Sequence, residues 1–328
     1  MYVVTGGAGF IGSNIVAALE ERGDEDIAVC DVFGTDEKWK NLAKRTLAYV
    51  VSPEKLMGFL DDHREDITAI FHMGAISSTT ETDVDLIMSS NFELTTALWQ
   101  WCAKHDKRLI YASSAATYGD GDQGFVDNDN LPALEKLRPM NAYGWSKHLV
   151  DKRIVSQINK KRKAPAQWVG LKFFNVYGPN EYHKGSMQSV IAHLYPKISA
   201  GEPAKLFKSY KKEYPHGGQL RDFVWVGDCV DVMMWFLDNP KQSGIFNVGT
   251  GKAQPFSALA TAIFTALTKK PDIEFFEMPE TLREKYQYYT QADMSRLRKA
   301  GYKKPFTSLQ DGTKEYVLKY LATADPYR

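Results

Sequence analysis

Short apolar runs alternate with helical patterns along the first half of the chain. Runs of strand length occur at residues 2–4, 27–30, 69–72, 108–112 and 168–174. The stretches between them place apolar residues three or four positions apart, as in the segment with Ile11, Ile15, Val16 and Leu19. Alternation of this kind predicts an α/β fold in which helices cover both faces of a doubly wound parallel sheet.

The alternation of apolar runs and helical patterns becomes less regular after residue 176. A polar, turn-rich loop at 177–186 precedes a helix expected at 187–199, while segments 221–226 and 244–248 again look sheet-associated. We therefore predict two interleaved parts. A dinucleotide-binding domain would comprise residues 1–176 with 222–248 returning to it, and a smaller C-terminal substrate-binding lobe would comprise 177–221 and 249–328. Ligands of open α/β sheets bind beyond the carboxyl ends of the strands, so the 177–186 loop is placed to cover one.

A glycine-rich turn follows the first strand and opens the first helix. It reads Thr-Gly-Gly-Ala-Gly-Phe-Ile-Gly from Thr5 to Gly12. Glycines allow close approach of the backbone to a ligand, and a helix start attracts a pyrophosphate. Roughly twenty residues further on, after a second apolar run, stands Asp31, where a dinucleotide site places an acid on the adenosine ribose. These features together predict a Rossmann-type NAD(P) site.

Composition excludes several classes of partner. The chain has 328 residues, 44% of them hydrophobic, with 41 basic and 40 acidic side chains, so its charge favours neither nucleic acid nor a membrane surface. Three distant cysteines match no metal spacing and are expected to be buried thiols in a reduced compartment. Since the chain enters its first strand directly and no apolar run reaches the ~18 residues of a membrane span, we expect a cytoplasmic protein.

Tyr143 and Lys147 are the first candidates for catalysis. They are four residues apart in a segment with helical pattern, which places both side chains on one helix face. An ammonium near a phenol favours the phenolate, and this predicts that the pKa of Tyr143 lies below its usual value of about 10. A run of small hydroxyl residues around Ser114, at the carboxyl end of a strand, could hydrogen-bond the reacting oxygen. Alone, such a tyrosine–lysine pair is also common on protein surfaces.

The chain resembles the extended short-chain dehydrogenase/reductases that act on nucleotide sugars. The resemblance rests on the glycine turn, on the set Ser114, Tyr143 and Lys147, and on the segment Phe-Asn-Val-Tyr-Gly-Pro at 174–179. Segments 72–81, 183–187 and 287–293 resemble, within that superfamily, the ADP-L-glycero-D-manno-heptose 6-epimerase family. The resemblance covers essentially the whole chain.

The resemblance implies an epimerase that oxidises C6 of an ADP-heptose with bound NADP and returns the hydride to the opposite face of a transient ketone. Two acid–base groups are then required, for which the family pattern assigns Tyr143 and Lys184. Lys147 serves the cofactor ribose and the phenolate, and Ser114 holds the reacting oxygen. The family also implies a homo-oligomer, a pentamer, and a product that enters lipopolysaccharide core. From the residues alone, a solvated loop lysine is the favoured interpretation of Lys184, and the family segment around it reverses that preference.

The same resemblance assigns the remaining contacts. Cofactor contacts are Gly6, Gly9, Phe10, Ile11, Gly12, Asp31, Val32, Lys38, Met73, Gly74, Ala75, Ile76, Ser77, Asn91, Lys147, Val176 and Lys184. Substrate contacts are Asn175, Ser186, His193, Phe207, Lys208, Ser209, Tyr210, Arg221 and Tyr286. Purely structural roles stay open as alternatives. His193 and Tyr286 could be core or surface residues, and Arg221 could form a salt bridge with Asp222. No metal site is expected.

The match has three departures. Val32 replaces the asparagine usual after Asp31, a lysine expected near residue 53 is missing unless Lys55 serves, and 211–218 looks like an inserted, solvated loop. Asp31 alone would repel a 2′-phosphate and suits NAD, whereas Lys38 could offset that repulsion. NADP is therefore the expected cofactor, with NAD possible.

Three other functions compete with the 6-epimerase. A UDP-sugar 4-epimerase shares the turn, the hydroxyl run and the tyrosine–lysine pair, but its single tyrosine serves both faces of the sugar, so Lys184 speaks against it. A 4,6-dehydratase carries an Asp-Glu pair where this chain has Ala115 and Ala116. A cofactor-sensing binding protein without turnover usually lacks the tyrosine or the lysine, and both are present here.

Overall fold

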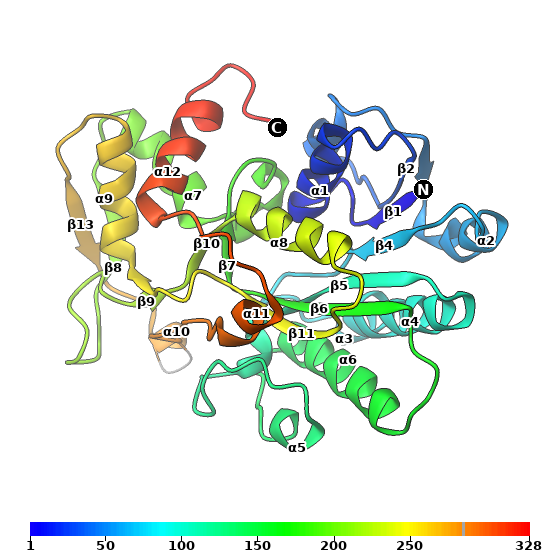
Figure 1. Ribbon diagram of the computed structural model, residues 1–328. Coiled ribbons are helices and arrows are strands. Elements are labelled where there is room, and N and C mark those ends of the chain that lie inside the picture. The colour runs from blue at the N-terminus through cyan, green and yellow to red at the C-terminus, as the bar shows by residue number, and fades with distance from the viewer. Residues whose placement is uncertain (284–285) are drawn as a thin grey trace.

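The computed structural model describes residues 1–283 and 286–328 and contains a parallel sheet of seven strands, drawn in Figure 1. The order of its strands across the sheet is β11-β6-β5-β4-β1-β2-β3. This order confirms the predicted doubly wound α/β fold, with a switch point between β1 and β4 where such sheets bind ligands. The strands are β1 (Tyr2–Thr5), β2 (Ile27–Cys30), β3 (Tyr49–Val51), β4 (Ala69–His72), β5 (Arg108–Ser114), β6 (Gln167–Phe173) and β11 (Gly244–Val248).

Helices lie on both faces of this sheet. Figure 1 shows α1 and α8 on one side and α4 and α6 on the other. The central strands read as continuous apolar runs because they are buried on both faces. All three cysteines, Cys30, Cys102 and Cys229, are buried in the core around the sheet. The helices of this part are α1 (Phe10–Glu21), α2 (Leu56–Asp62), α3 (Val84–Ile87), α4 (Leu94–His105), α5 (Leu131–Leu134), α6 (Ala142–Asn159), α8 (Val226–Asp238) and α11 (Ser295–Ala300).

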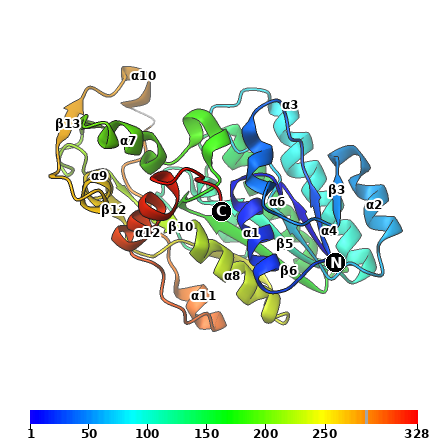
Figure 2. The same cartoon turned by 90° about the horizontal axis from the view of Figure 1, so that it is seen from above.

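A smaller group of elements packs around a second core beyond the carboxyl ends of the strands, and Figure 2 shows it at the opposite end of the molecule from α2 and α4. Helices α7 and α12 contact α9 there, and two strands, β8 and β13, pair in parallel. Its elements are α7 (Val190–Ser199), β8 (Ala204–Phe207), β9 (Leu220–Arg221), β12 (Gln254–Pro255), α9 (Phe256–Ala266), β13 (Ile273–Phe276), α10 (Glu280–Arg283) and α12 (Leu309–Tyr316).

The connection between the two cores differs from the sequence pattern in detail. Segment 221–226 contributes β10 (Phe223–Trp225), which pairs with β7 (Asn175–Tyr177) in a two-stranded sheet of its own, while β11 joins the large sheet as expected. Residues Ala292, Leu297 and Tyr302, within the range assigned to the second lobe, are buried in the first core. After the second lobe begins, the chain therefore returns to the first core twice, once at β11 and once around residues 292–302.

The helix expected at 187–199 begins later, at Val190. Ser189 accepts a hydrogen bond from the Ala192 amide and so acts as the N-cap, and Met187 instead ends a short 3₁₀ helix (Tyr182–Met187). A serine side chain that satisfies a free amide of the first turn is a stronger start signal than an apolar methionine upstream of it.

Candidate active site

The glycine turn has the close packing that only glycine permits. Gly6 has a φ of 65°, and a Cβ at that position would lie 2.5 Å from the amide nitrogen of Gly74. A Cβ on Gly12 would lie 2.0 Å from the Gly6 carbonyl oxygen. Among the described residues no side chain caps the start of α1, and its first turn has no acidic residue. This end of α1 therefore offers free N–H groups and positive potential to a pyrophosphate.

Asp31 joins the turn to the end of β2. Its Oδ2 accepts a hydrogen bond from the Ala8 amide at 2.8 Å, and its Oδ1 accepts one from Lys38 Nζ at 2.6 Å. The Lys38 ammonium also donates to the Val32 carbonyl at 2.9 Å. Lys38 thus neutralises the carboxylate locally, which reduces the repulsion that Asp31 would exert on a ribose phosphate.

The loop after β4 forms the next part of the site. The Ile76 amide donates to Asn91 Oδ1 at 2.8 Å, and Asn91 Nδ2 donates to the Ile76 carbonyl at 2.9 Å and to Ser146 Oγ at 3.0 Å. Asn91 is buried and does not line the cavity. In this structure it ties the loop to α6, so its effect on a cofactor would be indirect.

Tyr143 lies at the start of α6, where Asn141 caps the helix by accepting a hydrogen bond from the Gly144 amide at 2.8 Å. A Cβ on Gly144 would lie 2.7 Å from the Ala116 carbonyl oxygen, so α6 packs tightly on the 3₁₀ helix that follows Ser114. This packing brings Tyr143 within hydrogen-bonding reach of Ser114. Ser114 and Tyr143 therefore lie together at this end of α6.

The charges around Tyr143 differ from the expectation. Burial raises the pKa of Tyr143, and the hydrogen bond with Ser114 opposes that rise. Burial lowers the pKa of Lys147 to about 8, although the nearby Asp151 carboxylate raises it. The lowered Tyr143 pKa expected from the sequence is thus not observed, because desolvation of the phenolate outweighs the hydrogen bond that favours it.

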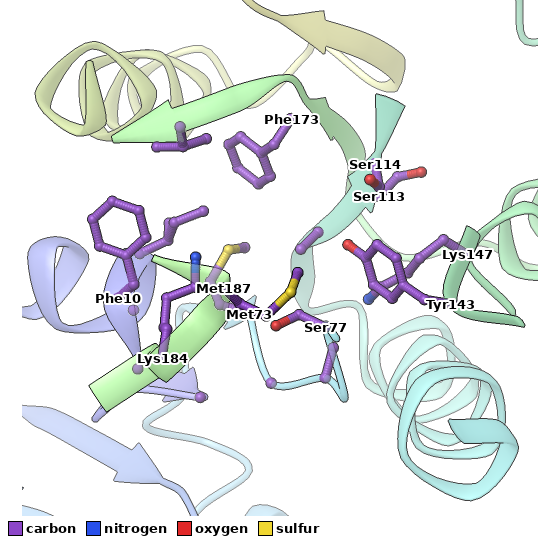
Figure 3. A pocket seen from close by; sticks show the side chains of 18 of the residues that line it. Phe10, Met73, Ser77, Ser113, Ser114, Tyr143, Lys147, Phe173, Lys184 and Met187 are labelled. Carbon is purple, nitrogen blue, oxygen red and sulfur yellow. The ribbon is translucent and has the colours of Figure 1, made fainter. Parts of the chain in front are cut away.

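Lys184 reaches the same cavity from the opposite wall. Its Nζ lies 5.1 Å from the centroid of the Phe10 ring, and Figure 3 shows the amine pointing into the space that the Tyr143 hydroxyl also faces. Burial lowers the pKa of Lys184, and the charge of the buried Glu181 opposes this. Glu181 accepts hydrogen bonds from Ser189 Oγ at 2.7 Å and Tyr316 OH at 3.0 Å, which fix the base of the loop.

One cavity of about 300 Å³ collects most of the predicted cofactor and catalytic residues. Its predicted lining residues are Gly6, Gly9, Phe10, Ile11, Gly12, Asp31, Lys38, Met73, Gly74, Ala75, Ser77, Ser114, Tyr143, Lys147, Val176 and Lys184. Sequence reasoning missed six others, namely Ala112, Ser113, Phe173, Phe174, His183 and Met187. The first four stand at the ends of β5 and β6, where the carboxyl-end rule could have identified them.

Two of the predicted substrate residues line a second, smaller cavity of about 190 Å³, between α7, β8 and β13. Phe207 and Tyr286 line it together with Phe256 and Phe276. The rings of Phe207 and Tyr286 pack edge to face with centroids 6.1 Å apart. The flat rings could accommodate a nucleotide base, because aromatic side chains stack on planar heterocycles.

Arg221 stands beside these aromatic rings. Its guanidinium lies 5.4 Å from the Tyr286 ring centroid and 5.6 Å from that of Phe256. It donates to the backbone carbonyls of Leu220 and Gln287, whereas Asp222 accepts hydrogen bonds from the Thr250 amide and hydroxyl. The structure therefore gives no Arg221–Asp222 salt bridge. A buried guanidinium with donors to spare is suited to a phosphate.

The remaining predicted contacts line neither cavity. They are Val32, Ile76, Asn91, Asn175, Ser186, His193, Lys208, Ser209 and Tyr210. Val32 is 62% exposed, and exposed Lys55 also lies outside both cavities. In the 211–218 loop, Lys211 Nζ lies 4.8 Å over the Tyr288 ring, so this lysine packs on an aromatic side chain.

Within residues 1–283 and 286–328, no helix combines the length and apolarity needed to cross a membrane. In the same part of the chain, His, Cys, Asp and Glu side chains form no group of three that could hold a metal ion.

Comparison with known proteins shows similarity along the whole chain. The model of the NAD dependent epimerase/dehydratase family matches residues 2–249. A Nitratidesulfovibrio vulgaris protein named ADP-L-glycero-D-manno-heptose-6-epimerase is 49% identical over 330 residues, which cover 100% of both chains. The crystal structure of the Helicobacter pylori ADP-L-glycero-D-manno-heptose-6-epimerase has a TM-score of 0.79 and 27% identity, covering 96% of this chain and 94% of that one. Thermus thermophilus UDP-glucose 4-epimerase, solved in complex with NAD, has a TM-score of 0.71 and 27% identity, covering 95% of this chain and 96% of its own.

Proposed function

Because this chain belongs to the NAD dependent epimerase/dehydratase family, we propose that it converts ADP-D-glycero-D-manno-heptose to ADP-L-glycero-D-manno-heptose by inversion at C6. The chain is an epimerase, and the full-length relative that is 49% identical bears the name of this reaction. The observation that supports the proposal most is the placement of Tyr143 and Lys184 around one cavity. Inversion at a carbon outside the sugar ring needs a proton carrier on each face of it.

The described residues fit a dinucleotide. The turn leaves no space for a Cβ at Gly6 or Gly12, so its backbone can approach a pyrophosphate, and the start of α1 supplies free donors. Asp31 would hold the adenosine ribose, and Lys147, one helical turn from Tyr143, would hold the second ribose. A nicotinamide held by these residues would supply reversible hydride transfer at C6 of the heptose.

Tyr143 removes or returns the hydroxyl proton on one face of C6. Ser114 would hydrogen-bond the C6 oxygen of the sugar. Its hydrogen bond with Tyr143 favours the phenolate of that tyrosine. The protonated Lys147 adds a positive charge behind the phenol, and its pKa of about 8 keeps it largely charged at neutral pH. General acid–base groups of this kind contribute on the order of 10²–10⁴ in rate.

Lys184 exchanges the proton on the opposite face. Its lowered pKa makes the neutral amine more accessible than in an exposed lysine, and Glu181 limits that shift. A single-tyrosine 4-epimerase has no need of this second group. The two-base assignment therefore favours inversion at C6 over a UDP-sugar 4-epimerase.

The ADP part of the substrate would bind in the second lobe. Phe207 and Tyr286 would contact the adenine in the smaller cavity, and Arg221 would bind the pyrophosphate. Asn175, Ser186, His193, Lys208, Ser209 and Tyr210 complete the proposed substrate set.

The finer assignments follow from the same family. NADP is the proposed cofactor because Lys38 already compensates Asp31, which reduces repulsion of a 2′-phosphate. We also propose that the protein is a homo-oligomer, specifically a pentamer, and that it acts in the cytoplasm. Light scattering of the purified protein tests the subunit number.

The deciding experiment incubates purified protein with NADP and ADP-D-glycero-D-manno-heptose and follows the epimer ratio by NMR. Approach to one equilibrium ratio from either pure epimer is expected. Absence of exchange, together with interconversion of UDP-glucose and UDP-galactose, would replace the proposed reaction by a 4-epimerisation. Cofactor binding without turnover of either sugar would instead indicate a sensing protein.

A further inference from the structure

Asp151 on α6 and Lys172 on β6 form a fully buried ion pair. Lys172 Nζ lies 2.8 Å from Asp151 Oδ2, and both side chains are 0% exposed. Asp151 follows Tyr143 and Lys147 at intervals of four residues on α6, so the three share one helix face. Removal of two charges from water is unfavourable, and apolar residues often replace such a pair without loss of stability. Fold stability alone therefore does not account for this pair.

The hydrogen bonds of Asp151 go to the end of β5. Asp151 Oδ2 accepts from Ser113 Oγ at 2.8 Å, and Oδ1 accepts from Tyr111 OH at 3.2 Å. Ser113 immediately precedes Ser114 and itself lines the cavity. Asp151 thus fixes the strand on the N-terminal side of Ser114.

The hydrogen bonds of Lys172 go to the other side of the same residue. Lys172 Nζ donates to Thr117 Oγ1 at 2.5 Å, and Thr117 Oγ1 donates to the Ser114 carbonyl at 2.8 Å. The ammonium also lies 4.8 Å over the Tyr118 ring. Lys172 thus fixes the 3₁₀ turn on the C-terminal side of Ser114.

We propose that the buried Asp151–Lys172 pair is a positioning pair for the reaction. It holds Ser114 from both sides and places a carboxylate behind Lys147, so that the serine hydroxyl, the tyrosine and the ammonium keep one arrangement. This inference rests on the proposed function for the identity of the reaction, and its geometry is independent of which nucleotide sugar reacts.

The charges around Lys147 give the pair a measurable effect. Asp151 is the group that raises the pKa of Lys147 against burial, and the charge of Lys147 contributes to lowering the pKa of His72 on β4. Tyr143 lies on the same helix face. Around Asp151 itself stand four other titratable groups: Lys172, Tyr111, Tyr118 and His148. Loss of the carboxylate should therefore lower the pKa of Lys147 further below about 8, by roughly one unit.

The central test replaces both charges at once, with Asp151→Asn and Lys172→Met, so that neither member of the ion pair is left without the other. We expect a folded protein with a melting temperature close to that of the wild type. Its kcat should fall at least tenfold with KM little changed, and the alkaline limb of its kcat–pH profile should move to lower pH. Wild-type kcat together with a wild-type pH profile in the folded double variant would overturn the proposal.

Two single variants decide the question if the double variant does not fold. Thr117→Val and Ser113→Ala cut the links to Ser114 and keep both charges, so both should lower kcat without moving the alkaline limb. Wild-type kcat in both would overturn the proposal. Asp228→Asn is the matched control: this buried aspartate holds Thr307 by two hydrogen bonds and lies outside the cavity, so its loss should lower stability only.

A readout without substrate separates this inference from the proposed function. NMR of ¹⁵N-labelled lysine amines, with the Lys147 signal assigned through Lys147→Arg, reports the titration of that amine directly. A lower Lys147 midpoint in the double variant supports the pair even if wild-type protein does not turn over ADP-heptose. An unchanged midpoint would overturn the electrostatic part of the proposal.

Discussion

Tyr143 and Lys184 face one cavity from different layers of the molecule, the first on helix α6 that covers the sheet and the second in the loop that follows β7. Their separation across the cavity means that each can be removed while the other keeps its surroundings, so the two proton-transfer roles can be tested independently.

Tyr143→Phe should abolish epimerisation, because it removes the hydroxyl that exchanges a proton and leaves the ring packed. We expect a loss on the order of 10²–10⁴ in kcat with cofactor affinity and melting temperature nearly unchanged. Tyr302→Phe is a suitable control, since that buried tyrosine hydroxyl has no hydrogen-bond partner within the described part of the chain. Activity of Tyr143→Phe within a few-fold of wild type would remove Tyr143 from the mechanism.

Lys184→Met keeps most of the aliphatic chain over Phe10 and removes the proton carrier. Interconversion of the two ADP-heptose epimers at saturating substrate should slow by orders of magnitude, as for loss of a general acid–base group, while substrate and cofactor still bind. The exposed Lys241→Met controls for the change of residue type. Near-normal turnover beside an inactive Tyr143→Phe would favour chemistry with one tyrosine serving both faces.

Lys38→Ala should weaken NADP binding more than NAD binding. The substitution leaves Asp31 without its cation, and the carboxylate then repels a 2′-phosphate. Charge-assisted hydrogen bonds to phosphate are worth roughly 1.5–3 kcal/mol, or about one to two powers of ten in affinity. Titration calorimetry with both cofactors measures the difference. Equal losses of affinity for NADP and NAD would show that Lys38 does not recognise the 2′-phosphate.

Two buried histidines and one half-buried histidine should make the fold sensitive to acid. Burial lowers the pKa of His72 to about 3 and those of His148 and His183 to about 4. An unfolded histidine titrates near 6.5, so the unfolded chain binds more protons between about pH 6.5 and 4, and stability is lost as the pH falls through that window. His148→Met should reduce the slope of unfolding free energy against pH by up to about 1.4 kcal/mol per unit. Denaturant unfolding from pH 7.5 to 4.5 measures it, and an unchanged slope would contradict the assignment.

The sequence allowed prediction of those site features that depend on short spacings. The strand–glycine–helix order places Gly6 and Gly12, and a helical repeat places Tyr143 beside Lys147, because local geometry alone determines both. The cavity residues at the strand ends, such as Ser113 and Phe174, depend on the register of neighbouring strands, which apolar runs do not specify. The start of α7 depended on the Ser189 cap, which the apolar pattern around Met187 obscured.

The second lobe was less predictable for a related reason. Phe207 and Tyr286 lie far apart in the sequence and meet only through packing of β8, β13 and the segment after α10. Asn91 resembles a ligand contact by position, yet its amide is used by Ile76 and Ser146. Satisfaction of buried polar groups is a property of the folded chain and leaves little local trace in a sequence.

The burial of all three cysteines makes the native protein well suited to site-specific thiol labelling. Cys30 is 3% exposed, burial raises its pKa to about 12, and burial also raises the pKa values of the Cys102 and Cys229 thiols. Maleimides react with exposed thiolates, so the unmodified chain should remain unlabelled while folded. A cysteine introduced at exposed Lys212, in the 211–218 loop, would then carry a single fluorophore and report on the surroundings of that loop when cofactor and sugar bind.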